Sequence, residues 1–209
     1  MNITVRVFLL ALLCVVTEFT ASQSSSTLSD QFRALLDTSI HCVIGAWCWY
    51  TVVDGAGVFQ ILICGFLSSF IDIDHFIAAG SFSLKAAVSL PNRPIFHAVL
   101  AIPVAALVLK LVSKLFLACV NQLSLPKDFS CLKSLLPTLP WLLVIAWSSH
   151  QLRDSIRRGL WFWPFGTLPP TPFVVYVVFI AGGSFLLNWI LKVFLKKTET
   201  SDGASFYEV

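Results

Sequence analysis

The sequence predicts an all-α fold, a polytopic membrane helix bundle of about five to six transmembrane helices. Of the 209 residues, 57% are hydrophobic and 12% are charged, whereas an average soluble domain has roughly 25% charged residues. The mean hydropathy is +0.84. The apolar residues are also gathered into separate stretches, most of which approach the roughly 20 residues that a helix needs to cross a bilayer. The lipid bilayer is therefore a predicted partner, in a membrane that the sequence does not identify.

Six apolar stretches follow one another, at residues 5–19, 41–53, 58–77, 95–120, 139–150 and 172–194. Gly, Pro and polar residues separate them, as is typical of loops. The second stretch is short, and dipping into the membrane is the alternative to crossing it. We predict a single multi-pass membrane domain over residues 1–195, followed by a polar disordered tail over residues 196–209.

Residues 1–22 are either the first transmembrane helix or a signal sequence. Arg6 precedes an apolar run, and small residues follow the run near Ala21, which is also the pattern of a cleaved secretory signal. Glu18 interrupts the end of the run and favours a retained helix.

Charge and cysteine usage exclude other classes of function. The net charge of +3 is small and the basic residues are scattered, so nucleic acid is not a predicted partner. The six cysteines form no CxxC pair and most lie inside apolar stretches. We interpret them as small buried side chains, in preference to disulfides or soft-metal ligands.

All four histidines lie in or beside apolar stretches, and each has charged or helix-end neighbours. Ionisable residues at membrane depth are costly and indicate a functional site by default. If the six helices alternate in direction, four helix ends fall on one side of the membrane. These ends carry His41, the block Asp72–His75, His97, and the pair His150 and Asp154. We therefore expect one shared site at one membrane face.

Helical spacing adds detail to this site. Asp72 and His75 are three residues apart and His150 and Asp154 are four apart, so each pair shares a helix face. Asp74 would point elsewhere on a regular helix. Either the helix ends there, or Asp74 orients an imidazole from outside the ligand set.

Imidazole and carboxylate groups that converge in a dry pocket predict a divalent metal ion. The candidate ligands are His41, Asp72, Asp74, His75, His97, His150 and Asp154. These exceed the four ligands of one tetrahedral zinc, so the set would serve two metals, or one metal with supporting residues. Without thiolates, zinc, manganese and iron all fit. Such an ion would lower the pKa of a bound water and stabilise negative charge on an attacked ester.

Structural alternatives exist for each residue taken separately. His41 could be a helix cap, and the two aspartates could pair with basic residues in the loops. Arginines can snorkel from a helix end towards water, and tryptophans can form an interfacial belt. The aspartates are Asp72 and Asp74, and their basic partners would be Lys85, Arg93 or Arg157. The snorkelling arginines would be Arg153, Arg157 and Arg158. The tryptophans of the belt would be Trp47, Trp49, Trp141, Trp147, Trp161 and Trp163.

Four blocks carry a family resemblance: IDIDH ending at His75, NRPIFH ending at His97, HQLRD beginning at His150, and GLWFWPF beginning at Gly159. Their order is similar to that in bacterial YdjM-like inner-membrane proteins, which are described as metal-dependent hydrolases. Those proteins share Pro-Asp-x-Asp-His, His-Arg-Gly-x-Thr-His, a late His-x-x-x-Asp and a closing Trp-Pro. His41 with Gly45 resembles their opening His-x-x-x-Gly helix.

From about Leu35 to Phe165 the chain more closely resembles the vertebrate transmembrane protein 267 family, which has no established activity. The segments HCVIGAWCW, SLKAAVSLPNRP and IRRGLWFWPFG carry this resemblance. Compared with the bacterial pattern, Ile71 replaces a proline, Asn92 a histidine and Phe96 a threonine. One ligand is therefore missing, so that a two-metal site would be reduced to one, or catalysis lost while the scaffold is kept.

The resemblance implies a metal-dependent hydrolase, although the sequence leaves open whether the chain is an enzyme. Asp72, His75, His97, His150 and Asp154 would be the ligands, supported by His41 and Asp74. Arg93, Arg157 and Arg158 would hold the anionic group of a lipid-linked or phosphorylated substrate, since guanidinium binds phosphate bidentately. The alternatives are a non-catalytic membrane scaffold that keeps a relic polar site, and a metal or proton carrier.

Overall fold

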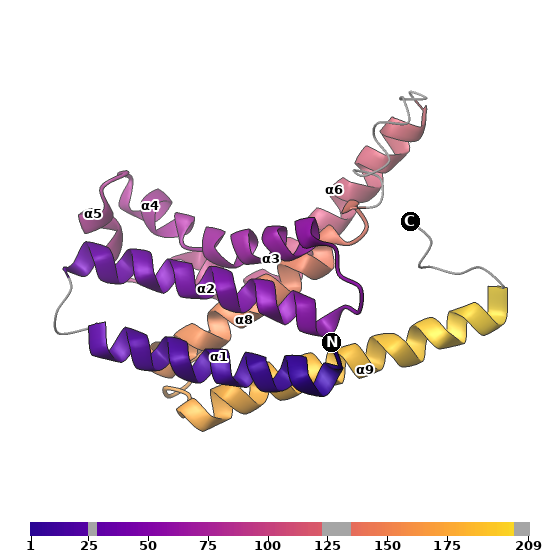
Figure 1. The fold of residues 1–209 in the computed structure, drawn as a ribbon. Helices are drawn as coiled ribbons and strands as arrows, with labels where there is room; N and C mark the ends of the chain where they lie inside the picture. The colour runs from indigo at the N-terminus through magenta and orange to yellow at the C-terminus, as the bar shows by residue number, and fades with distance from the viewer. Residues whose placement is uncertain (25–28, 123–134, 203–209) are drawn as a thin grey trace.

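A computed structural model describes residues 1–24, 29–122 and 135–202 of the chain. The structure is helical (Figure 1), and this confirms the predicted all-α membrane bundle. The helices are α1 (Ile3–Ser24), α2 (Asp30–Val52), α3 (Val58–Phe70), α4 (Ile73–Ala79), α5 (Leu84–Val88), α6 (Ala101–Gln122), α8 (Leu139–Arg158) and α9 (Phe173–Asp202). A 3₁₀ turn, η1 (Ile95–His97), precedes α6, and an antiparallel pair, β1 (Trp161–Phe162) and β2 (Gly166–Thr167), follows α8.

Four segments of the described chain are long and apolar enough to cross a membrane: Ile3–Ser24, Val58–Ala79, Ala101–Val120 and Phe173–Val193. Helices α2 and α8 have 23 and 20 residues, but their composition is more polar. Helix α8 packs against α2, α3, α6 and α9, and α2 packs against α1, α3, α8 and α9. The two polar helices therefore lie inside the bundle, where the apolar helices cover them.

Helices α2 and α8 are longer than the apolar stretches that mark them in the sequence. Helix α2 begins at Asp30, where the Ser29 side chain accepts a hydrogen bond from the Phe32 N–H. His41 therefore lies about 16 Å inside the helix, at 1.5 Å per residue. His150 is likewise inside α8, which continues to Arg158. The prediction that these histidines lie at helix ends is wrong, because amphipathic turns extend each helix beyond its apolar stretch.

The segment Val58–Ala79 is broken into α3 and α4 by a turn at Ile71 and Asp72. At this turn the Asp72 N–H donates to the carbonyl of Ser69, at 3.3 Å, instead of to that of Ser68 as an α-helix requires. The break places a free carbonyl and two aspartates in the middle of the bundle.

Close packing of α2 against α3 depends on two glycines. A Cβ added to Gly45 would lie 2.5 Å from the Ser68 Cβ, and one added to Gly65 would lie 2.7 Å from the Cys42 carbonyl oxygen. Small residues let helix backbones approach closely in a membrane bundle. This contact brings the broken end of α3 beside His41.

Helix α1 is bound to the rest of the bundle by polar contacts. Arg6 is buried, pairs with Asp54 and donates to the Tyr50 carbonyl at 2.6 Å. Glu18 lies 2.6 Å from the Nε of Arg153 on α8.

Helix α9 runs to Asp202, so residues 196–202 continue the helix where we predicted a disordered tail. Residues 203–209 lie outside the described part. The structure describes five of the six cysteines, all as free thiols. Cys14, Cys48 and Cys64 are buried, as predicted, whereas Cys42 is partly buried and Cys119 is exposed. Cys131 lies outside the described residues.

Candidate metal centre

Four side-chain atoms converge at the centre of the bundle: Asp72 Oδ1, His97 Nε2, His150 Nε2 and Asp154 Oδ2. The His97 and His150 nitrogens are 3.3 Å apart, and each is 3.5 Å from the Asp72 oxygen. The Asp154 oxygen lies 3.8 Å from the His97 nitrogen and 3.9 Å from the His150 nitrogen. Zinc with bonds of about 2.0–2.1 Å holds tetrahedral ligand atoms about 3.3 Å apart. The separations match this value closely for Asp72, His97 and His150. Asp154 lies farther from both nitrogens, and its ligand atom is within 4.8 Å of those of His41 and His150.

Each of the two histidines is held by a second contact at its other ring nitrogen. His97 Nδ1 lies 3.3 Å from an Asp74 carboxylate oxygen. His150 Nδ1 lies 2.7 Å from the Ser68 carbonyl oxygen, which the break at the end of α3 leaves free. Because both partners accept hydrogen bonds, each Nδ1 carries a proton. A metal-binding histidine almost always has such a partner, which fixes its tautomer and its ring direction.

The backbone on either side of His97 is fixed as well. Gln151 donates to the carbonyls of Phe96 at 2.9 Å and Ala98 at 3.1 Å, and the Phe96 N–H donates to Asp74 at 2.9 Å. The sequence analysis missed Gln151, although it directly follows His150 in the chain.

His97 is surrounded by negative charge. Burial lowers the pKa of this imidazole, but hydrogen bonding to Asp72 and Asp74 raises it by more, to about 9. Without a metal ion, His97 therefore holds a proton at neutral pH.

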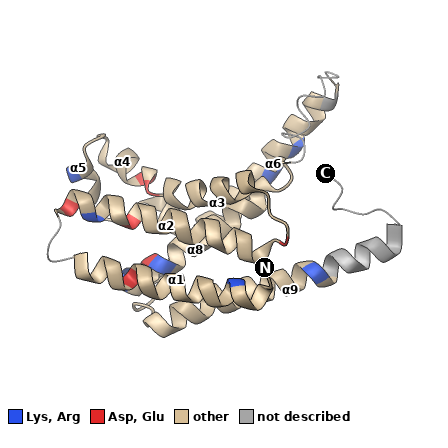
Figure 2. Cartoon of the chain, viewed as in Figure 1, with Lys and Arg blue, Asp and Glu red and all other residues tan. Residues whose placement is uncertain are grey.

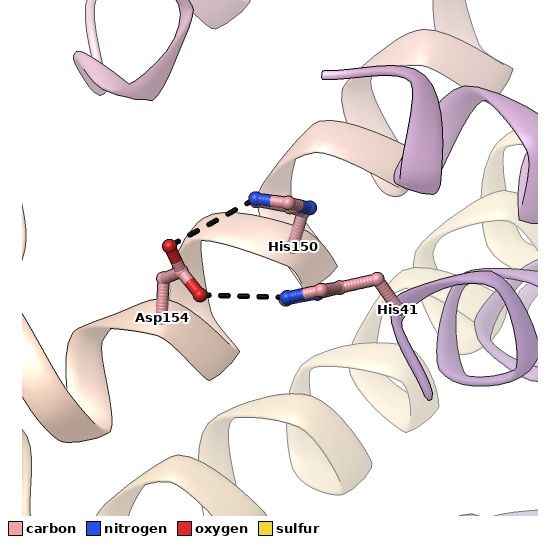
Figure 3. A group of neighbouring side chains, drawn as sticks. All are labelled: His41, His150 and Asp154. Carbon is pink, nitrogen blue, oxygen red and sulfur yellow. Dashed lines mark ion pairs between the residues drawn. The ribbon is translucent and has the colours of Figure 1, made fainter. Parts of the chain in front are cut away.

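Asp154 joins this cluster to His41 (Figure 3). One carboxylate oxygen faces His150, and the other lies 3.4 Å from His41 Nε2. The rings of His41 and His150 stack with centroids 3.8 Å apart. His41 is thus in direct contact with two members of the cluster, and ligand atoms of His41, His150 and Asp154 lie within 4.8 Å of one another.

Arg153 contacts the same nitrogen of His41 that faces Asp154. It is fully buried, and its Nη1 lies 2.5 Å from Asp37 and 3.1 Å from His41 Nε2, while its Nε faces Glu18. The alternative that Arg153 snorkels from a helix end is therefore wrong. Asp37 and Glu18 were missed by the sequence analysis; the spacing of four residues between Asp37 and His41 was the available signal.

His75 lies beside the cluster but faces a different acceptor. Its Nδ1 is 3.1 Å from the Ala87 carbonyl oxygen on α5, and its ring meets that of His97 edge-on, with centroids 4.9 Å apart. Ligand atoms of Asp74, His75 and His97 lie within 4.8 Å of one another. All seven predicted ligands are thus brought together, in three overlapping groups.

A cavity of about 390 Å³ opens directly over the cluster. Asp72, His75 and Asp154 lie in its lining, and so do all three predicted substrate-binding arginines, Arg93, Arg157 and Arg158. Figure 2 shows acidic and basic residues at this end of the bundle, on α2, α4 and α5. The cavity therefore connects the cluster to the protein surface at this charged end of the bundle.

The three arginines differ in their partners. Arg93 donates to the Gly159 carbonyl at 2.9 Å, and Arg157 contacts both carboxylate oxygens of Asp37, at 2.5 and 3.3 Å. Within the described chain, Arg158 has no ion-pair partner.

Two structural alternatives from the sequence are not found. Among the described residues, Asp72 and Asp74 contact His97 and make no ion pair with Lys85, Arg93 or Arg157. The interfacial-belt interpretation fails for Trp49 and Trp147, which are 3% and 7% exposed in the core.

Comparison with known proteins gives one family. Transmembrane protein 267 of Bos taurus is 43% identical over 162 residues, which cover 76% of this chain and 69% of the relative. Transmembrane protein 267 of Xenopus laevis is 42% identical over 175 residues, with 82% and 75% covered. That of Danio rerio is 41% identical over 152 residues, with 71% and 62% covered.

No family model and no solved structure matches the chain. The resemblance to the bacterial hydrolases stays a prediction. The identity to curated relatives over most of both chains shows that this chain belongs to the transmembrane protein 267 family.

Proposed function

We propose that the chain binds one divalent metal ion between Asp72, His97, His150 and Asp154, and uses it to hydrolyse a phosphate-bearing substrate. One observation carries the proposal: two histidines direct Nε2 at a single point while Asp74 and the Ser68 carbonyl hold their Nδ1 atoms. Without an ion at that point, a proton on His97 has to bridge the two nitrogens, which lie 3.3 Å apart.

The donor set of two imidazoles and two carboxylates suits zinc, manganese or iron. Catalysis needs a further coordination position for water. Asp72 and Asp154 both line the cavity, so water would reach the ion from that side. A bound divalent ion would lower the pKa of this water and neutralise charge on the phosphate.

The three arginines support an anionic substrate because guanidinium groups bind phosphate oxygens in pairs. Hydrolysis transfers the water oxygen to phosphorus, breaks the bond between phosphorus and the ester oxygen, and places one water proton on the leaving alcohol. His75 is suited to carry that proton. Its Nδ1–H is bound to the Ala87 carbonyl, which leaves Nε2 free beside the cavity.

The first test is the metal content of detergent-purified protein, measured by elemental analysis. We expect close to one zinc, manganese or iron per chain in the wild type, and its loss in the double variant His97→Ala and His150→Ala. His75→Gln is the matched control and should keep the metal. A folded wild type that holds no metal after reconstitution with each of the three ions contradicts the proposal.

The second test concerns the reaction. Phosphate release should require the metal, and it should fall strongly when Arg93, Arg157 and Arg158 are all changed to glutamine. If the triple variant retains full activity on every phosphorylated substrate that the wild type hydrolyses, the arginines have no role in binding the substrate.

A further inference from the structure

Two chemical kinds of side chain line the cavity above the cluster. The charged part of the lining consists of carboxylates and arginines. The apolar part comes from α4, α5 and the loop that follows, and it includes Phe76, Leu84, Val88 and Leu90. A small, fully hydrated phosphate compound would use only the charged part.

The charge of the lining identifies the kind of phosphate. Three aspartates and three arginines line the cavity, namely Asp37, Asp72, Asp154, Arg93, Arg157 and Arg158. These charges balance, so a bound divalent ion gives the lining an excess of positive charge, which the buried Asp74 carboxylate behind His97 partly offsets. A phosphomonoester carries nearly two negative charges at neutral pH, and it would match this lining better than a singly charged diester.

The apolar side of the cavity lies at the boundary of the membrane. One candidate span ends at Ala79 and the next begins at Ala101, so α5 and its loops lie between two crossings at one membrane face. Val88 lines the cavity and is 50% exposed. An apolar side chain in this segment would be close enough to the bilayer to contact a lipid that enters the cavity.

Two loops at this end of the bundle, before α5 and after α8, carry exposed aromatic side chains. Phe82, in the loop before α5, is 98% exposed, and Phe165, in the hairpin after α8, is 85% exposed. Trp163 in the same hairpin is also exposed. Aromatic side chains at a membrane–water boundary are favourable in the headgroup layer, which would keep the mouth of the cavity at the level of lipid headgroups.

From these observations, and resting on the proposed function, we infer that the substrate is a membrane lipid with a terminal phosphomonoester. Its phosphate lies at the metal between the arginines, and the first part of its chain lies against Leu84 and Val88. The cavity, at about 390 Å³, is near the lower end of the range for ligand pockets. The remainder of the lipid chain stays in the bilayer.

The test compares two substrates with the same headgroup. Dioleoyl phosphatidic acid in mixed micelles is the lipid probe, and glycerol 3-phosphate is its water-soluble counterpart. With the metal-loaded full chain, we expect phosphate release from the lipid at a kcat/KM at least about tenfold higher than from glycerol 3-phosphate. The products would be diacylglycerol and inorganic phosphate.

Two variants test the apolar wall. Leu84→Gln and Val88→Gln should each raise KM for the lipid several-fold, since each methylene buried in the complex contributes a factor of about four in affinity. Metal content and the rate on glycerol 3-phosphate should not change. Phe19→Gln is the control, an exposed apolar residue on α1 that does not line the cavity.

The outcomes distinguish a failure of this inference from a failure of the proposed function on which it rests. If the metal-loaded protein hydrolyses both probes equally well, the lipid inference is wrong while the metal-dependent hydrolase stands. Unchanged lipid kinetics in both wall variants also overturn the inference. If metal-loaded protein releases phosphate from neither probe, the lipid inference fails, and the hydrolase proposal fails with it once a panel of other phosphate esters is not hydrolysed either.

Discussion

His97 and His150 bring their Nε2 atoms to within 3.3 Å of each other at the centre of the bundle. Each Nδ1 faces an acceptor, so two neutral rings would direct two lone pairs at one point. This arrangement is stable only with a positive charge near that point. In the metal-free protein the proton on His97 supplies it, and in our proposal a divalent ion takes its place.

Metal affinity should therefore depend on pH. The pKa of His97 is raised to about 9 by Asp72 and Asp74, so below about pH 9 the metal must displace its proton. We expect the affinity for zinc to rise about tenfold per pH unit between about pH 6 and 8, and to level off above pH 9. Competition titrations against a chelating dye measure this. A dissociation constant that stays constant over this range would show that no proton is displaced.

Asp74 should strengthen the affinity for the metal ion without binding the ion itself. It holds His97 Nδ1 at 3.3 Å, and loss of such an orienting partner typically weakens metal affinity by roughly 10–100-fold. We expect Asp74→Asn to show this loss in the same titrations while still binding one ion at saturation. Asp30→Asn, at the exposed start of α2, should leave the affinity unchanged. If Asp74→Asn abolishes binding even at saturation, Asp74 is itself a ligand.

Arg153 should be essential for folding. It is fully buried against Asp37 and Glu18, and removing one partner of a buried ion pair typically costs about 3–5 kcal/mol. We expect Arg153→Gln to lower the melting temperature and the accumulated amount of protein strongly. Arg33→Gln, which removes an exposed pair with Asp30, should cost about 0–1 kcal/mol.

A double variant separates the charge of Arg153 from its packing. If the loss is electrostatic, adding Asp37→Asn to Arg153→Gln should destabilise the protein less than the sum of the two single changes. Strict additivity of the two changes would contradict the buried ion pair.

Gly45 should not tolerate a side chain. A Cβ there would lie 2.5 Å from the Ser68 Cβ, and overpacking a well-packed core typically costs about 1–3 kcal/mol. We expect Gly45→Ala to lower the melting temperature measurably. Gly57→Ala is the matched control, because no atom lies within 4 Å of its added Cβ. Equal melting temperatures for the two variants would show that α2 and α3 are not this close.

Several features of the site are readable from the chain because they depend on composition and local spacing. The apolar stretches predict the bundle, and their alternation predicts that Asp72, His97 and His150 share one site. Spacing by four residues puts His150 and Asp154 on one helix face. Arginines next to these blocks predict the charged lining of the cavity. None of these inferences requires knowledge of how the helices cross.

The remaining features were decided by tertiary contacts. The sequence offered two roles for Asp74, and the break after α3 allows both Asp72 and Asp74 to contact His97. Hydropathy marked His41 as a helix end because it does not detect the amphipathic turns before it. One sequence-based alternative for Arg153 was a side chain that snorkels from a helix end, whereas in the structure it pairs with Asp37 and Glu18.

Composition and spacing thus determined the class of the protein and which residues share one cluster. The tertiary structure alone decided which atoms meet. Those contacts depend on a helix break and on the close approach of α2 to α3, which arise from packing between segments far apart in the chain.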